Sequence, residues 1–177
     1  IPIVLADRNY DQNGMLLYDS LNMDGLLGDK NLVNGRVQPY FEVERRKYRF
    51  RILNSGISRF HDVWFSNGMT FQYIANDGNM IPTPMTLQNV KLGVAERADI
   101  VIDFSQLPAS TTEIYLVNRA EQTNGRGPSG ATLPSAASNI RSRTLTNIGT
   151  SPMPGPSITI GKIGRLRCVT AATWTIA

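Results

Sequence analysis

Residues 31–54 read NLVNGRVQPYFEVERRKYRFRILN, and this stretch decides the fold class. It contains Asn34-Gly35, a turn dipeptide in which both residues tolerate a positive φ. Between residues 47 and 53, apolar and cationic side chains alternate with a period of two, which predicts a strand buried on one face. The buried face would carry Tyr48, Phe50 and Ile52, opposite Lys47, Arg49 and Arg51.

Similar turn signals continue along residues 1–118. The dipeptides Asn13-Gly14, Asn67-Gly68 and Asp77-Gly78 separate short β-rich runs that recur about every 8–12 residues, as in a sandwich or barrel. No window carries a sustained helical period of apolar residues. The sequence therefore predicts an all-β protein of antiparallel type. Strands are expected near residues 3–6, 15–18, 31–33, 40–43, 47–53, 60–65, 71–75, 87–92, 100–104 and 114–117.

Two runs carry more specific expectations. Residues 60–65 are apolar on both faces of a strand, which predicts a central position between two packed layers. Residues 79–84 contain Pro82 and Pro84, which cannot donate a hydrogen bond to a neighbouring strand. We therefore expect this second run to be a connection or a sheet edge.

Composition and charge divide the chain. Its 177 residues fit one domain, and the net charge of +4 combines −2 over residues 1–118 with +6 over residues 119–177. After Asn118 the chain is rich in Gly, Ser, Pro and Arg, with Trp174 as its one aromatic residue. This shift predicts a β-sandwich domain over residues 1–118. Residues 119–177 would form a linker or tail, an irregular C-terminal extension whose packing the composition leaves open.

The chain begins at Ile1 in an expected strand, without an initiator Met or a charged-then-apolar leader. That start suggests a processed product, an engineered fragment or an excerpt of a longer protein. No apolar run approaches the roughly 18 residues of a membrane span, so a membrane is not an expected partner.

The ligand count argues against copper or nucleophilic chemistry in this chain. His61 is the one histidine and Cys168 the one cysteine. A type 1 copper site uses two imidazoles, a thiolate and a weak axial ligand, so the chain is one imidazole short. A Cys–His nucleophile pair would require residues 107 positions apart to meet. We expect His61 to be a strand residue with a hydrogen-bond partner and Cys168 a small apolar filler, and no residue is assigned to catalysis, cofactor binding or a metal.

Three other patterns have structural interpretations. Residues 125–130, GRGPSG, match G-x-G-x-x-G but lack the following helix and acidic residue of a dinucleotide site, which favours a loop. Asp99 and Asp103 lie four strand steps apart, about 13 Å, which is too far for a glycosidase pair. Surface acids are expected instead, with Arg97 as a candidate partner of Asp99. Met69, Met80 and Met85 are expected to fill gaps in a core.

Nucleic-acid binding is not expected from the basic run at residues 44–51. Its aromatic side chains lie opposite its charges and would be buried in the core, so they would not form a stacking platform. The +6 excess of residues 119–177 supports a weaker hypothesis, in which the tail binds anionic surfaces or nucleic acid in a salt-dependent way.

The order of short motifs over residues 1–118 resembles the second domain of three-domain multicopper oxidases, of the spore-coat laccase and bilirubin oxidase type. The matching motifs are residues 1–5, Asp7-Arg8, Gly28-Asp29, residues 33–35, Pro39, Val43-Glu44, residues 46–54, residues 58–60, residues 66–68, residues 76–78 and residues 95–99.

The resemblance implies a cupredoxin-like Greek-key sandwich that is free of copper and separates two copper-binding cupredoxin domains of the same enzyme. Such enzymes oxidise phenols or bilirubin and reduce dioxygen to water, with copper held by His-x-His and His-Cys-His motifs that this sequence lacks. The leading hypothesis is therefore a structural spacer that is inert alone. The alternative is a standalone β-sandwich that binds a protein partner.

Overall fold

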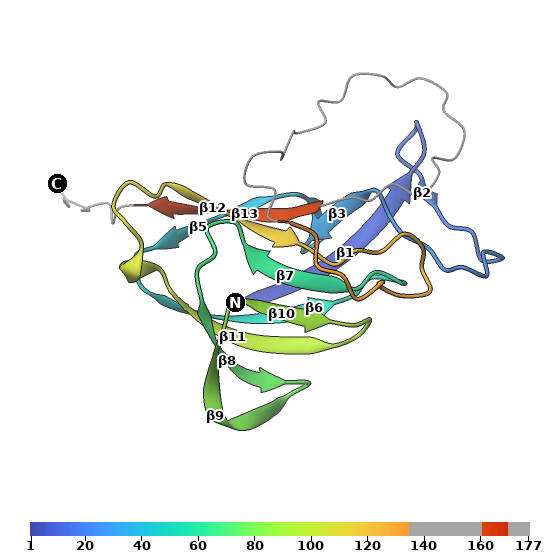
Figure 1. The fold of residues 1–177 in the computed structure, drawn as a ribbon. Coiled ribbons are helices and arrows are strands. Elements are labelled where there is room, and N and C mark those ends of the chain that lie inside the picture. The colour runs from blue at the N-terminus through green and yellow to red at the C-terminus, as the bar shows by residue number, and fades with distance from the viewer. Residues whose placement is uncertain (135–160, 170–177) are drawn as a thin grey trace.

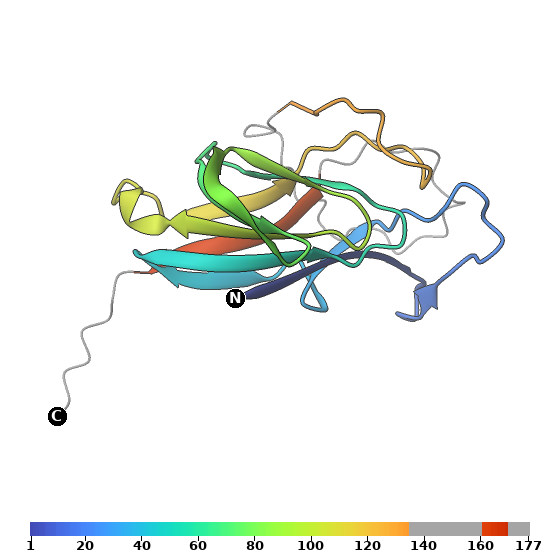
Figure 2. The same cartoon turned by 90° about the horizontal axis from the view of Figure 1, so that it is seen from below.

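The computed structural model describes residues 1–134 and 161–169, and they form a two-layer β-sandwich (Figures 1 and 2). The larger layer has eight strands, in the order β4-β3-β1-β6-β11-β8-β9, with β2 paired to β1. Its strands are β1 (Pro2–Tyr10), β2 (Leu16–Leu17), β3 (Lys30–Val33), β4 (Arg36–Val37), β6 (Lys47–Asn54), β8 (Phe71–Asn76), β9 (Asn79–Leu87) and β11 (Arg97–Asp103).

The second layer has five strands, in the order β10-β7-β12-β13-β5. They are β5 (Tyr40–Glu44), β7 (His61–Phe65), β10 (Asn89–Leu92), β12 (Glu113–Asn118) and β13 (Gly161–Val169). A short 3-10 helix, η1 (Phe104–Gln106), follows β11. No helix in the described part of the chain is long and apolar enough to cross a membrane. The predicted all-β sandwich is confirmed.

The core lies between the two layers and follows the predicted alternation. On β6, Phe50 and Ile52 are each 1 % exposed, whereas the three cationic residues between and before them face solvent. β7 is buried on both faces, as expected: Val63 and Phe65 join the inter-sheet core. Its other face is covered by the chain after β12, where the Arg119 guanidinium lies 4.2 Å from the centre of a Trp64 ring.

Turn chemistry fixes two hairpins. Asn34 and Gly35 have φ of 50° and 79° between β3 and β4, and Asp77 and Gly78 have φ of 46° and 89° between β8 and β9. Two consecutive residues of positive φ produce a turn whose twist matches that of the paired strands. Register in these hairpins is therefore encoded locally.

Two features of the sheet order depart from the antiparallel pattern expected from the sequence. β1 pairs with β6 in parallel, and β13 pairs with β5 in parallel. Parallel neighbours need a long connection between them, so the short turn dipeptides do not report them. The prediction of a sheet edge at residues 79–84 is confirmed, because β9 ends the larger layer and carries both prolines.

β13 lies within the range that composition assigned to an irregular extension. It pairs with β12 on one side and with β5 on the other, so it completes the smaller layer. Ile163 and Leu166 of this strand are buried in the core. The difference has a physical reason: β13 acquires its order from two strands that are distant in the sequence, and local composition carries no signal of that pairing.

Candidate functional site

His61 lies on β7 with 1 % of its surface exposed. Burial is the main reason that its pKa falls to about 3, and the positive charge of Arg59 lowers the pKa further. The imidazole is therefore neutral near pH 7. Neither ring nitrogen has a hydrogen-bond partner among the described residues. The predicted strand position is confirmed, and the predicted hydrogen-bond partner is wrong.

Cys168 lies on β13, half-buried against the core, and is far from His61. β12 lies between β7 and β13, so the distance between His61 and Cys168 can be estimated along this strand. The Cys168 amide donates to the carbonyl of Thr112, just before β12, whereas Arg119, just after β12, donates to the carbonyl of Asp62 beside His61. At about 3.3 Å per residue, Thr112 and Arg119 are about 23 Å apart. The two residues therefore cannot form a nucleophile pair.

The described residues do not fit a copper ion. No group of three or more His, Cys, Asp or Glu side chains within residues 1–134 and 161–169 lies close enough to hold a metal. A blue-copper site needs two imidazoles and a thiolate that converge on one point. Here one imidazole and one thiol lie toward opposite ends of β12, so the donor set and its geometry are both inadequate.

Three of the motifs that carry the family resemblance are instead joined by a buried ion pair and its hydrogen bonds. Arg59 Nε donates to Asp7 Oδ2 at 2.8 Å, and these side chains are 10 % and 1 % exposed. Gly28 N donates to the same carboxylate oxygen at 2.5 Å, and Arg59 also donates to the Gly28 carbonyl at 2.7 Å. A Cβ at Gly28 would lie 2.2 Å from Arg8 N, so only glycine fits. Three separate motifs thus meet at one polar cluster, which sequence reasoning did not identify as a contact.

Asn54, the last residue of the opening stretch, holds a second buried cluster. Its side chain is fully buried, and its Nδ2 donates to the carbonyls of Arg59, Leu92 and Gly93. Its Oδ1 accepts a hydrogen bond from Gly56 N at 3.0 Å. One amide thus ties the end of β6 to the loops around β7 and β10.

Asp99 and Asp103 are ion-paired acids on β11, although one partner differs from the expectation. Asp99 binds Arg49 and Arg51 of β6. Arg97, expected to pair with Asp99, instead pairs with Asp77 of the β8–β9 turn at 3.3 Å. In an antiparallel sheet, direct cross-strand neighbours are closer than residues two apart on one strand, so Asp99 pairs across to β6.

The basic run at residues 44–51 is engaged in contacts within the fold. Arg45 donates to the carbonyls of Leu107, Pro108, Ala109 and Thr111. Arg46 pairs with Glu44 at 2.7 Å and stacks over the ring of Tyr48. Its cations thus hold neighbouring backbone and carboxylates in place.

The remaining candidates have structural roles. Residues 125–130 form a loop that packs against Gly25, and its Arg126 pairs with Asp24 at 2.6 Å. Met69 packs against the core as expected. Met80 and Met85 lie exposed on the edge strand β9, so the prediction that they fill gaps in the core is wrong. Of the tail cations, Arg165 and Arg167 pair with Glu113. Arg141 and Arg143 lie outside the described residues.

One surface segment is unusually apolar. Residues 15–23 include six large hydrophobic side chains that are at least half exposed, two of them above 80 %. They belong to β2 and to the chain on either side of it, at the end of the molecule where the β1–β2 hairpin lies (Figure 1). They are Met15, Leu16, Leu17, Tyr18, Leu21 and Met23. Concentrated exposure of this kind marks an interaction surface.

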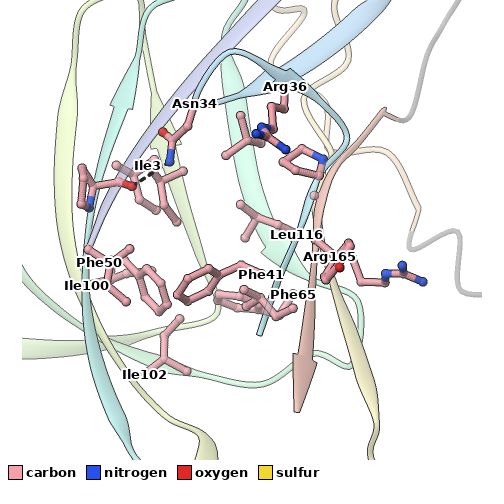
Figure 3. Close-up of a pocket in the computed structure, with 18 residues that line it drawn as sticks. Ile3, Asn34, Arg36, Phe41, Phe50, Phe65, Ile100, Ile102, Leu116 and Arg165 are labelled. Atoms are coloured by element: carbon pink, nitrogen blue, oxygen red, sulfur yellow. Dashed lines mark hydrogen bonds between the residues drawn. The ribbon is translucent and has the colours of Figure 1, made fainter. Parts of the chain in front are cut away.

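A cavity of about 360 Å³ opens between the two layers (Figure 3). Its walls are mainly apolar and come from both sheets: Phe50, Ile100 and Ile102 from the larger, Phe65 and Leu116 from the smaller. Arg36 and Arg165 are at its margin. No sequence pattern predicted this cavity, because its lining residues come from strands of both sheets that are distant in the sequence.

Comparison with known proteins agrees with this fold. Residues 2–141 match the family described as multicopper oxidase. The chain is 39 % identical over 127 residues to "Multicopper oxidase LPR1 homolog 5" of Oryza sativa subsp. japonica, an alignment covering 71 % of this chain and 20 % of that protein. It is 36 % identical over 132 residues to "Laccase" of Bacillus subtilis (strain 168), covering 68 % and 25 %. It is 31 % identical over 172 residues to "Cell division protein FtsP" of Dickeya dadantii (strain 3937), covering 94 % and 36 %.

Among solved structures, the McoA multicopper oxidase of Aquifex aeolicus superposes with a TM-score of 0.71 at 24 % identity, over 100 % of this chain and 33 % of that one. This likeness shows the fold. The chain spans about a fifth to a third of the length of these relatives. From the matched residues and the sandwich together, this chain belongs to the multicopper oxidase family, of which it represents one cupredoxin-like domain.

Proposed function

We propose that this chain is the middle, copper-free domain of a three-domain oxidase of the spore-coat laccase and bilirubin oxidase type. Its function is to hold two flanking copper-binding domains at a fixed separation, and it is not catalytic alone. The observation that carries the proposal is that the residues of the family-like motifs form buried structural contacts. Asp7, Gly28, Asn54 and Arg59 all stabilise the scaffold.

The parent reaction follows from the family resemblance. A phenolic or bilirubin-like substrate loses electrons one at a time, and four electrons with four protons reduce one dioxygen to two waters. Copper supplies the redox chemistry in the flanking domains. The residues of this chain supply a rigid spacer, because its buried ion pair and its Asn54 cluster tie loops to the sheets.

The exposed apolar segment at residues 15–23 supports the part of the proposal in which this domain contacts a flanking domain of the same polypeptide. Its six exposed hydrophobic side chains would be buried against a neighbouring cupredoxin domain, which removes apolar surface from water. This chain covers 33 % of the Aquifex aeolicus McoA chain, so a protein of that length has room for two further domains.

Two measurements test the proposal. The residues encoded on either side of this segment should include His-x-His upstream and His-Cys-His downstream. Cu(II) titrated into the purified 177-residue chain should give neither an intense blue absorption band nor oxidation of a phenolic dye. Stoichiometric blue-copper binding by this chain would contradict the proposal.

A second candidate is a standalone β-sandwich module that binds a protein partner. The observation that favours it is the exposed apolar segment at residues 15–23, which would then contact a separate protein. Recovery from cells of a 177-residue species without flanking copper domains would support this module and contradict the spacer.

A further inference from the structure

We propose that the inter-sheet cavity binds a small apolar molecule that carries one carboxylate, such as a medium-chain fatty acid. Such binding is independent of whether the parent protein is an oxidase. Protein interiors are close-packed and rarely contain voids much larger than a water molecule. An open volume of about 360 Å³ between the two layers is therefore unusual, and it falls within the range of about 300–1,000 Å³ typical of small-molecule pockets.

The apolar walls of the cavity favour an apolar ligand. Phe50, Ile52, Ile100 and Ile102 of the larger sheet form the inner wall of the cavity and are each about 1 % exposed, whereas Tyr40 and Phe41 on its open side are 57 % and 42 % exposed. Figure 3 shows Phe41 and Phe65 opposite them. A polar guest would lose its hydration here without compensation, whereas an alkyl chain or a single ring would bury apolar surface.

The charged group at the margin of the cavity, the Arg36 guanidinium, favours a ligand with a carboxylate. Asn34 already accepts from Val4 N and donates to the carbonyl of Pro2. Arg165 pairs with Glu113, and its guanidinium points away from the cavity in Figure 3. Within the described part of the chain, the Arg36 side chain has no hydrogen bond or ion pair, and it lies at one end of the cavity. A guanidinium in this position complements an anionic head group.

Glycine at position 164 keeps the cavity open. Gly164 lines the cavity, and a Cβ there would face Pro39 O at 3.4 Å and Val33 Cγ2 at 3.5 Å, which are ordinary contacts with two other lining residues. A larger side chain at position 164 would therefore extend into the cavity without a backbone clash at its Cβ. This makes Gly164→Leu a suitable blocking variant.

The test uses the full chain and three probes of equal chain length: octanoate, octanol and octylammonium. Isoleucine methyl NMR shifts report the site, because Ile52, Ile100 and Ile102 line the cavity and Ile114 and Ile163 do not. We expect octanoate to shift only the lining methyls and to bind about two- to fivefold more tightly than octanol, the range for one partly exposed ion pair. Octylammonium should bind more weakly than octanol.

Variants then separate the two parts of the proposal. Gly164→Leu should reduce octanoate affinity at least about tenfold, and Arg36→Gln should abolish the preference for octanoate over octanol. Lys91→Gln removes the same charge from β10, outside the cavity, and should change neither. If Gly164→Leu does not fold, Ile3→Trp blocks the cavity from β1. Unshifted lining methyls, equal binding to the blocked variant, or equal affinity for octanoate and octanol would overturn the proposal.

Discussion

Arg59 and Asp7 form a buried ion pair at 2.8 Å between the chain entering β7 and the middle of β1, 52 residues earlier. The pair also binds both backbone groups of Gly28, so it joins three segments. One carboxylate oxygen, Asp7 Oδ1, has no hydrogen-bond partner among the described residues. The buried negative charge of Asp7 is therefore compensated mainly by the Arg59 guanidinium. This cluster closes the loop between β1 and β3 onto the sandwich.

Removal of one partner should be strongly destabilising. We expect Arg59→Met to lower the free energy of unfolding by about 3–5 kcal/mol, because it leaves a buried carboxylate uncompensated. Urea denaturation of the purified chain measures this change. The matched control is Arg126→Met, which breaks the exposed pair with Asp24 and should cost less than about 1 kcal/mol. Similar costs for the two variants would contradict the assigned role of burial.

Gly28→Ala should destabilise the protein through a steric clash. The added methyl would lie 2.2 Å from Arg8 N and 2.6 Å from Asp7 C, which are backbone atoms of β1. We expect a loss of more than about 2 kcal/mol in the free energy of unfolding. Gly164→Ala, whose methyl would make contacts of 3.4 Å, is the control and should change stability by less than about 1 kcal/mol. A wild-type melting temperature for Gly28→Ala would show that the cluster is looser than described.

Asn54→Asp replaces a donor with an acceptor at a site that faces three carbonyl oxygens. The carboxylate cannot donate to them, and Gly56 N alone cannot compensate its burial. We expect a loss of more than about 3 kcal/mol at neutral pH. Thermal melting followed by circular dichroism measures it, with the exposed Asn67→Asp as the control. Retained stability in Asn54→Asp would contradict the role of the amide.

The low pKa of His61 predicts acid sensitivity. The folded-state pKa of about 3 lies below the ordinary 6.5, so the unfolded chain binds a proton that the folded chain does not between these values. Stability should therefore be highest above pH 6.5 and should fall as the pH drops toward 3. This one group should remove roughly 2–3 kcal/mol between pH 6 and pH 4, since one pKa unit corresponds to about 1.4 kcal/mol.

His61→Leu isolates that contribution from the carboxylates that also titrate. The substitution removes two unsatisfied ring nitrogens, so it should be neutral or stabilising at pH 7. Its advantage over wild type should grow as the pH falls from 6 to 4, measured by urea denaturation at each pH. A constant difference across this range would mean that His61 takes up a proton as readily in the folded protein as in the unfolded chain, and it would contradict the low pKa.

The apolar segment at residues 15–23 should matter for association and little for the stability of this chain. Leu21 and Met23 are 85 % and 88 % exposed, so Leu21→Ser with Met23→Ser should change the free energy of unfolding by less than about 1 kcal/mol. Under the proposed spacer function, the same double change in the longer protein should weaken contact between domains and lower the melting temperature of that protein. Equal melting temperatures of the substituted and wild-type parent would show that this segment is not part of the interface between domains.

Local sequence determined much of the fold because strand periodicity and turn chemistry depend on residues only a few positions apart. The alternation at residues 47–53 correctly placed Phe50 and Ile52 in the core. Asn34-Gly35 and Asp77-Gly78 correctly marked hairpins. The proline pair correctly placed residues 79–84 at a sheet edge.

The sequence by itself also determined that one imidazole and one thiol are available, a count that no folding can change. Tertiary structure alone decided which distant segments meet: β13 between β12 and β5, Arg59 on Asp7, and Arg97 on Asp77 in place of Asp99. It also left the cavity between the sheets. The reason is that these features depend on the three-dimensional path of the whole chain, so no short window of residues contains the information that specifies them.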